Sequence, residues 1–183
     1  MAFFSDRDIL RAIKGKTIRI EPFNPKHVGP GSVDCTLGNV FRVFRNVRDS
    51  EIDVRNPKAL EKLSELINVG GGEFFLLLPH ELVLATTREK VGISDKMVGF
   101  IEGRSSYARI GVAVHVTASF IQPGSYGIQT LEIYNLTNFP IKLYPGERVC
   151  QIIFAETKSK AKVPYGKVKG AKYYDQKGPE TAK

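Results

Sequence analysis

The second half of the chain is a succession of short apolar segments rich in β-branched and aromatic residues. VAVHVTASFI, YGIQTLEIYNL and FPIKLYPGERVCQIIFAE follow one another, separated by turn dipeptides such as Pro123-Gly124 and Pro145-Gly146. Segments of this length, bounded by such turns, are typical of β-strands. KTIRIEPF and VDCTLGNVFRVFRNV in the first half have the same character. Since only two segments show helical spacing, the sequence predicts an all-β fold, either a barrel or a double sheet.

The two segments with helical spacing lie in the first third of the chain. In SDRDILRAIKGK, Ser5 is a good N-cap and Asp8 follows three residues later, so we expect a short helix over about residues 6–14, closed by Gly15. NPKALEKLSELI predicts one further helix over residues 57–67, inserted between strands. Its apolar positions are Leu60, Leu63, Leu66 and Ile67.

Length and charge indicate one basic domain. A chain of 183 residues suits a single domain over 1–183. Lys and Arg outnumber Asp and Glu by 27 to 19, and a net charge of +8 attracts anions such as nucleotides or nucleic acid. Residues 155–183 hold eight lysines against three acidic residues. No apolar run reaches the ~20 residues of a membrane span, and the charged N-terminus is unlike a signal peptide, so we expect a cytoplasmic protein without a membrane partner.

Cysteine and histidine usage gives no sign of a metal site. Cys35 and Cys150 are far apart and form no CxxC pair, and His27, His80 and His115 are scattered singly. We interpret all five as structural, with His115 a core or interface histidine. The chain also lacks a P-loop, a dinucleotide-binding GxGxxG, a GxSxG elbow and the HxE…PCxxC pattern of zinc deaminases.

GRSSYARIG is a polar segment between two apolar ones. If residues 105–110 form a helical turn or two, Ser105 caps it and shares a face with Arg109. Arg104 then precedes the helix start, where free backbone N–H groups favour an anion, so the segment suits a polyphosphate. The competing interpretation is a structural ion-pair cluster, with Arg109 paired to Glu102 or another acid. This segment alone leaves the two interpretations equal.

TLEIYN carries an acidic residue inside a predicted strand. Leu131 and Ile133 point one way, so Glu132 lies on the opposite face, toward solvent, a subunit interface or a site. A carboxylate held among apolar neighbours can exchange protons near neutrality. Periodicity alone favours a solvated glutamate.

Taken together and in order, these segments resemble the dCTP deaminase branch of the dUTPase-like superfamily. GRSSYARIG is similar to the family's Gly-Arg-Ser-Ser signature, and the other segments match its remaining motifs along nearly the whole chain. Those segments are GPGSVDCTLGNVFRVF (29–44), HVTASFIQPGSYG (115–127), TLEIYN (130–135), PGERVCQIIF (145–154) and KVPYGKVKGAKYYDQKG (162–178).

The resemblance implies a fold, an assembly and a reaction. Members are homotrimers of distorted β-barrel subunits with sites at subunit interfaces. The deaminases convert dCTP and water to dUTP and ammonia without zinc, and dTTP is a candidate inhibitor. Their substrate is the Mg²⁺ complex of the triphosphate, so no protein metal ligands are expected. The basic segment of about residues 155–183 would close over the nucleotide.

Mapped residue by residue, the resemblance implies a role for each matching position. Glu132 would be the proton shuttle, while Ser105 and the backbone carbonyl of Ala118 would hold the reacting water. Arg109 would stabilise developing charge at that water or the base. The substrate-binding positions would be Arg104, Ser106, Tyr165, Lys172 and Gln176, all toward phosphate, and Gln122 toward the sugar.

Two positions depart from the family pattern. Gln122 stands where the family has an aspartate that contacts the deoxyribose, and Phe120 stands where it has an arginine. An amide hydrogen-bonds a hydroxyl but cannot act as a base. The sequence therefore favours dUTP as the product. The alternatives are a bifunctional deaminase–diphosphatase that yields dUMP, and a non-catalytic regulatory relative. A nucleic-acid-binding barrel ranks last, because no aromatic–basic stripe is present.

Overall fold

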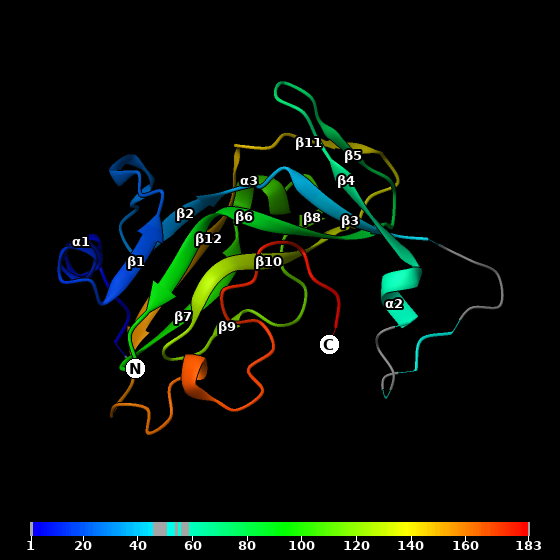
Figure 1. The fold of residues 1–183 in the computed structure, drawn as a ribbon. Coiled ribbons are helices and arrows are strands. Elements are labelled where there is room, and N and C mark those ends of the chain that lie inside the picture. The colour runs from blue at the N-terminus through cyan, green and yellow to red at the C-terminus, as the bar shows by residue number, and fades with distance from the viewer. Residues whose placement is uncertain (1, 46–50, 54, 56–58, 183) are drawn as a thin grey trace.

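The computed structural model describes residues 2–45, 51–53, 55 and 59–182, and strands dominate it (Figure 1). The all-β class predicted from the sequence is confirmed. The described helices are α1 (Asp6–Lys14), α2 (Ala59–Lys62) and α3 (Ser105–Ala108), with 3-10 turns η1 (Pro25–His27) and η2 (Tyr165–Lys167). The strands are β1 (Ile18–Glu21), β2 (Val33–Thr36), β3 (Val40–Phe44), β4 (Ser64–Asn68), β5 (Phe75–Leu77), β6 (Leu82–Ile93), β7 (Met97–Gly103), β8 (Val112–Ala113), β9 (Phe120–Ile121), β10 (Tyr126–Asn135), β11 (Ile141–Leu143) and β12 (Arg148–Glu156).

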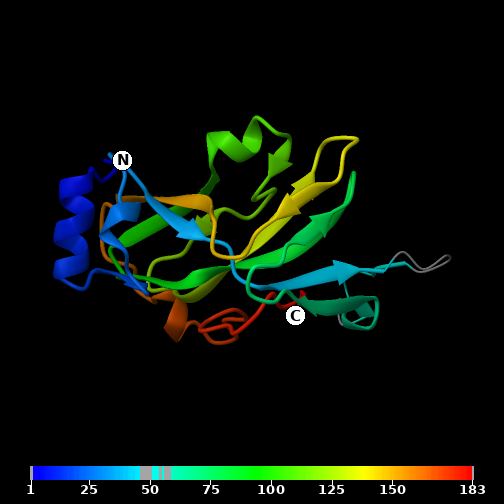
Figure 2. The same ribbon diagram turned by 90° about the horizontal axis from the view of Figure 1, so that it is seen from above.

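These strands pair into two larger sheets and one two-stranded sheet within the described residues. One larger sheet has the order β4-β3-β6-β10-β8 with β1 also paired to β6, and the other has the order β2-β12-β7-β9. β5 pairs with β11. The larger sheets are joined where Leu37 bridges Thr87 and where Gly38 N donates to Thr86 O over 2.7 Å. Seen from above, α1 and the β3–β4 arm lie at opposite ends of the molecule (Figure 2).

The core draws side chains from both larger sheets. Leu131 of β10 and Phe154 of β12 are fully buried within it, and Phe41 stacks on Phe75 with ring centroids 4.3 Å apart. Burying a side chain of this size stabilises the fold by roughly 1.5–3 kcal/mol. This shared core fixes the long central strands β6 and β10, on which the cavity described below is built.

The N-terminal helix forms as predicted. α1 spans Asp6–Lys14, with Ser5 as its N-cap and Gly15 as its C-cap. Ser5 N donates to Asp8 Oδ2 over 3.2 Å, which satisfies a backbone donor that the helix itself leaves unpaired. Ile9 is buried on the face toward the sheets. Local signals determine this helix, and they are all present in the sequence.

The predicted helix over 57–67 is wrong for most of its described length. Only Ala59–Lys62 is helical, and Ser64–Asn68 is the edge strand β4, paired antiparallel with β3; residues 57 and 58 lie outside the described part. Arg45 N donates to Leu63 O over 2.7 Å where the pairing begins. A short isolated helix is marginal because nucleation is costly, whereas β3 offers a ready row of backbone partners. Leu66 and Ile67 remain exposed on this arm.

Candidate active site

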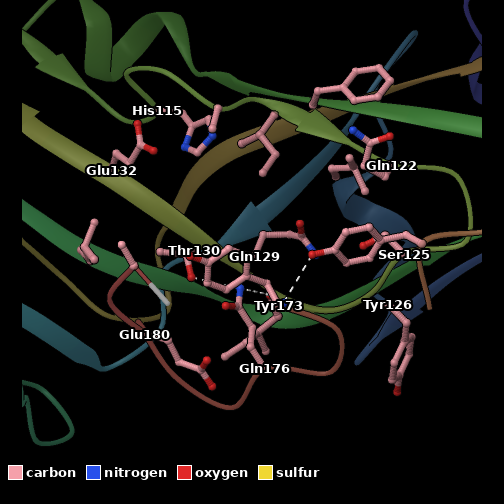
Figure 3. A pocket seen from close by; sticks show the side chains of 18 of the residues that line it. His115, Gln122, Ser125, Tyr126, Gln129, Thr130, Glu132, Tyr173, Gln176 and Glu180 are labelled. Atoms are coloured by element: carbon pink, nitrogen blue, oxygen red, sulfur yellow. Dashed lines mark hydrogen bonds between the residues drawn. The ribbon is translucent and has the colours of Figure 1, made fainter. Parts of the chain in front are cut away.

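A cavity of about 430 Å³ lies against β10, bounded by the loop that precedes β9 and by the C-terminal segment. Leu84 of β6 and Ile101 of β7 contribute apolar surface to the cavity wall. Since β6 and β7 belong to different larger sheets, the cavity spans the region where these sheets meet. Polar side chains come from three separate parts of the chain and converge on it (Figure 3). A concave site with mostly apolar walls and a few polar groups is the usual form of a small-molecule site.

Glu132 lies in the wall of this cavity. Its neighbours Leu131 and Ile133 are fully buried on the other face of β10, so the alternation predicted from TLEIYN is confirmed. Glu132 Oε2 accepts two hydrogen bonds from Thr117, one from the backbone N and one from Oγ1, each 2.8 Å long. Because Oε2 accepts both bonds, they fix the orientation of the carboxylate, and Oε1 makes no hydrogen bond to Thr117.

The loop before β9 brings two further residues to the same cavity. Ala118 lines it, as does His115, which lies beside Glu132 in Figure 3. Both ring nitrogens of His115 are buried without a hydrogen-bond partner among the described residues. His115, expected from the sequence to be a core or interface histidine, is half-buried and lies in the cavity wall. Unsatisfied buried nitrogens are rare, and a molecule bound in the cavity would supply their partner.

The GRSSYARIG segment folds as the short helix α3, and Arg104, Ser105, Ser106 and Arg109 do not line the cavity. The prediction that Ser105 caps this helix is wrong, because the N-cap is Arg104 and Ser105 is the first helical residue. Arg104 has extended backbone angles, and its carbonyl accepts from the backbone N of Tyr107 over 3.0 Å. Ser105, Ser106 and Arg109 are exposed.

An ion-pair cluster does form at this segment, but with different partners from those expected. Asp34 of β2 forms ion pairs with two arginines: Oδ1 lies 3.3 Å from Arg104 Nε, and Oδ2 lies 3.1 Å from Arg148 Nη1. Arg104 Nη1 also donates to the carbonyl of Arg148 over 2.9 Å. The competing interpretation of the sequence paired Arg109 with Glu102 or another acid. β12 pairs with both β2 and β7, and this brings together residues 70 positions apart, which no local pattern reveals.

The C-terminal segment supplies the rest of the cavity wall. Of the three residues that the resemblance assigns to phosphate on this segment, Tyr165 and Gln176 line the cavity, whereas Lys172 is exposed and lies outside the lining. Gln176 Nε2 donates to Thr130 Oγ1 over 3.0 Å. Tyr173, which the sequence analysis did not place in the site, lines it too, and its backbone N donates to Tyr165 Oη over 3.3 Å. The signal for Tyr173 was the presence of tyrosines in a basic tail that solvation alone does not require.

The two residues that depart from the family pattern, Phe120 and Gln122, both line the cavity. Gln122 lines the cavity, and its carbonyl accepts from Ser125 N over 3.0 Å in the turn that leads into β10. Phe120 also lines the cavity and contacts Phe100 of β7 edge-on, with ring centroids 5.4 Å apart. An amide and an aromatic ring therefore occupy the end of the cavity where the family pattern has two charged residues.

Next to the lining residues Tyr126 and Gln176, a group of charges is arranged around Asp175. Its Oδ1 lies 3.2 Å from Lys90 Nζ and its Oδ2 lies 2.6 Å from Lys177 Nζ. These hydrogen bonds, the one from Lys177 first, hold the pKa of Asp175 below its usual value, and Asp175 in turn raises the pKa of Lys90. Desolvation, and then a hydrogen bond to Glu21, raises the pKa of Tyr126. The pair that Lys90 forms with Asp175 ties β6 to the C-terminal segment.

Within the described residues, no three His, Cys, Asp or Glu side chains lie close enough together to hold a metal ion. Cys35 and Cys150 are both buried and free, and they are direct partners across the β2–β12 pair. No helix in this part of the chain has the length and apolar character needed to cross a membrane.

The fold and the cavity define a class: dUTPase-like β-folds. A 2′-deoxycytidine 5′-triphosphate deaminase from Agrobacterium tumefaciens superposes with a TM-score of 0.66 at 22% identity, over 85% of this chain and 48% of that one, so this chain spans about half its length. A D95N mutant dUTPase from Staphylococcus aureus phage phi11 superposes with a TM-score of 0.51 at 12% identity, over 79% of this chain and 94% of that one. The dUTPase-like fold expected from the resemblance is confirmed.

Within this class, the chain belongs to the dCTP deaminase-like family, whose model matches residues 3–157. A protein of Methanothermobacter thermautotrophicus named "dCTP deaminase, dUMP-forming" is 42% identical over 100% of this chain and 94% of its own length. A protein of Thermomicrobium roseum named "dCTP deaminase" is 42% identical over 98% of this chain and 92% of its own length. The family resemblance found in the sequence is thus confirmed.

Proposed function

We propose that this chain is a dCTP deaminase of pyrimidine deoxynucleotide metabolism, which uses water to release ammonia and needs no zinc. Membership of the dCTP deaminase-like family supports this proposal. The observation that carries it is the placement of Glu132 in the cavity wall, with one carboxylate oxygen fixed by Thr117. A general acid–base must be oriented toward the reacting atoms, and this arrangement supplies the orientation.

In the proposed mechanism, Glu132 moves protons between water and the cytosine ring. Its carboxylate takes a proton from water as the oxygen bonds to C4, and it delivers that proton to N3. The tetrahedral carbon then expels its amine, which leaves as ammonia after receiving the hydroxyl proton through Glu132, and the C4 carbonyl forms. The backbone carbonyl of Ala118, which lines the same cavity, would hold the water before attack.

The remaining predicted groups would come from a second copy of the chain. Ser105 and Arg109 are exposed and lie outside the cavity of their own chain. We propose a homotrimer in which α3 of one subunit completes the cavity of its neighbour, with Ser105 on the water and Arg109 on developing charge. Exposed apolar side chains support such an assembly, since Leu136 is 62% and Phe139 75% exposed.

The triphosphate would bind as its Mg²⁺ complex, with the ion carried by the substrate. Tyr165 and Gln176 already line the cavity, and Lys172 on the same segment would add a cation. Arg104 and Ser106 would approach the phosphates from the neighbouring α3. Arg104 would do so while paired with Asp34, a pairing that orients its guanidinium. The net charge of +8 favours capture of such an anion.

The final product is a separate question. The name of the Methanothermobacter relative favours the bifunctional alternative, in which dUTP and a second water give dUMP and pyrophosphate. This argues against dUTP, the product that the sequence analysis favours because Gln122 cannot act as a base. We propose dUMP as the product on the strength of the relatives. Chromatography of the products from dCTP, and separately from dUTP, decides it: pyrophosphate and dUMP support the second step, whereas accumulating dUTP rejects it.

The deaminase proposal is tested with purified protein, dCTP and Mg²⁺, by following the loss of cytosine absorbance. Wild type should turn over, Glu132→Gln should not, and Glu61→Gln, which alters an exposed glutamate on α2, should behave as wild type. If nucleotide binds tightly and Glu132→Gln matches an inert wild type, the chain is instead the non-catalytic regulatory relative. dTTP, added as a competitor, tests whether the same cavity senses a second nucleotide.

A further inference from the structure

The C-terminal strap, residues 175–182, is attached to the body of the protein by backbone and side-chain contacts. It begins beside the first residues of β10 and runs toward the β3–β4 arm, below the central strands in Figure 1. Its first residue is held by backbone, because Asp175 N donates to Tyr126 O over 2.8 Å. Pro179 and Thr181 are buried, and Glu180, Thr181 and Ala182 line the cavity. The strap therefore forms part of the wall of the proposed active site.

A close backbone approach is built into the strap's starting point. Gly127 has a φ of +144°, and a Cβ placed there would lie 3.2 Å from Asp175 Cα and 3.3 Å from Gln176 N. A side chain at this position would be strained by the backbone and would press on the strap. Glycine at position 127 thus permits the strap to lie directly on β10.

Two side-chain anchors hold the first part of the strap. Lys90 of β6 pairs with Asp175 over 3.2 Å. Gln176 Nε2 donates to both Ile128 O, over 2.9 Å, and Thr130 Oγ1, over 3.0 Å. These contacts fix the strap at β10, but they do not fix its far end.

Arg42 of β3 holds the far end. Its Nε donates to the carbonyl of Pro179 over 2.7 Å, and its Nη1 donates to Ser64 Oγ on β4 over 2.9 Å. The second bond locks the guanidinium against the sheet, so the first one clamps the strap to a rigid element. We propose that Arg42 is a positioning residue that keeps Gln176 and the end of the strap in the cavity wall and thereby sets nucleotide affinity. This role rests on the proposed function of the cavity.

The physical basis is preorganisation. A strap that is held against the body of the protein has less conformational freedom to lose when the nucleotide binds, so affinity is higher than for a free tail. Arg42 would touch no substrate atom. Its removal should therefore raise KM for dCTP by roughly five- to tenfold through loss of one charge-assisted hydrogen bond, with little change in kcat.

The first experiment needs no nucleotide. Amide hydrogen exchange of the full chain should be faster across the strap in Arg42→Ala than in wild type, and unchanged in Arg45→Ala. Arg45 lies just beyond the same strand, and its described ion pair is with Glu65 rather than with the strap. Arg42→Lys should restore part of the protection. If strap exchange in Arg42→Ala equals wild type, the clamp is refuted whatever the enzyme does.

The second experiment tests the consequence for dCTP. Removing residues 179–183 should raise KM at least as much as Arg42→Ala does, because it also removes lining residues of the cavity. Adding Arg42→Ala to the truncated chain should change nothing further, because the carbonyl of Pro179 that Arg42 binds is then gone. Additive effects would show that Arg42 acts through general stability and would overturn the proposal. If exchange changes as expected but no variant or wild type deaminates dCTP, the clamp stands and the proposed function fails.

Discussion

The cavity around Glu132 and the α3 segment carry the two halves of the proposed chemistry, and they differ in how complete they are. The cavity is assembled within one chain: Thr117 orients Glu132, and the C-terminal strap closes the wall. α3 instead presents Ser105 and Arg109 on the surface. Residues that the family motifs place in one site therefore need not line one cavity within a single chain.

The largest effect on activity is expected from the cavity around Glu132, which is assembled within one chain. Glu132→Gln keeps the shape and hydrogen bonds from Thr117 but removes the proton acceptor, so kcat should fall about a thousandfold. The measurement is steady-state loss of cytosine absorbance at saturating dCTP. KM should change little, since the amide still fits the cavity. A variant with more than about a tenth of wild-type kcat would remove Glu132 from the mechanism.

The proposed role of α3 in a neighbouring cavity is tested by mixing subunits that carry different substitutions. Arg109→Ala should lower kcat about a hundredfold through loss of charge stabilisation, whereas Arg7→Ala, on exposed α1, should not. If α3 serves the neighbouring cavity, co-refolding Arg109→Ala with Glu132→Gln creates some sites with both residues intact. Random trimers should then recover about a quarter of wild-type activity. No recovery, with trimers formed, would mean that both residues serve the same cavity.

Features that depend on local sequence could be predicted, whereas features that depend on strand pairing could not. The helix over 6–14 was predictable because its capping residues are local, and the face of Glu132 followed from alternation in one strand. The helix over 57–67 failed because its leucines fit helical spacing while β3 offered pairing that spacing cannot reveal. Ion pairs between Asp34 and its two arginines depend on strand order, which local patterns do not encode.

The residues of the candidate site also differ in whether the sequence could identify them. The resemblance placed Glu132, Ala118, Gln122, Tyr165 and Gln176, and all five line one cavity. What it could not supply were the residues that hold them. The orienting threonine at 117 and the anchors of the strap are ordinary polar residues, and their importance arises only from three-dimensional contacts.

A smaller effect is expected where α3 joins the body of the protein. Asp34→Asn removes the charge shared by Arg104 and Arg148, and its side chain is only 16% exposed. The free energy of unfolding should fall by about 2 kcal/mol, less than for a fully buried pair. Urea unfolding measures this, with exposed Asp6→Asn as the matched control expected to change little. An unchanged midpoint would show that the cluster is not structural, and would strengthen the case for Arg104 as a free phosphate ligand.

The smallest effect concerns pH and the Lys90–Asp175 pair. The pKa of Asp175 is lowered below 3.8, so its contribution is complete above that pH and is lost as the pH falls through the lowered value. The pKa of Lys90 is raised above 10.5, so its contribution is lost only as the pH rises through the raised value. Among the described residues, Lys177 and Glu21 also act on this pair. The ring centroid of Tyr126 lies 5.6 Å from Lys90 Nζ, and Arg19 acts on Tyr126.

Strap protection in amide exchange, corrected for intrinsic rates, should therefore be flat between about pH 5 and pH 9. Lys90→Met should lower that protection modestly and by the same factor throughout this range, because the pair is partly exposed and screened by salt. Added salt should bring wild type toward the variant. The contrary outcome is a rise or fall of wild-type protection near neutrality that is absent from Lys90→Met. It would show that a different titrating group controls the strap, and that the docking of the strap does not depend on the Lys90–Asp175 pair.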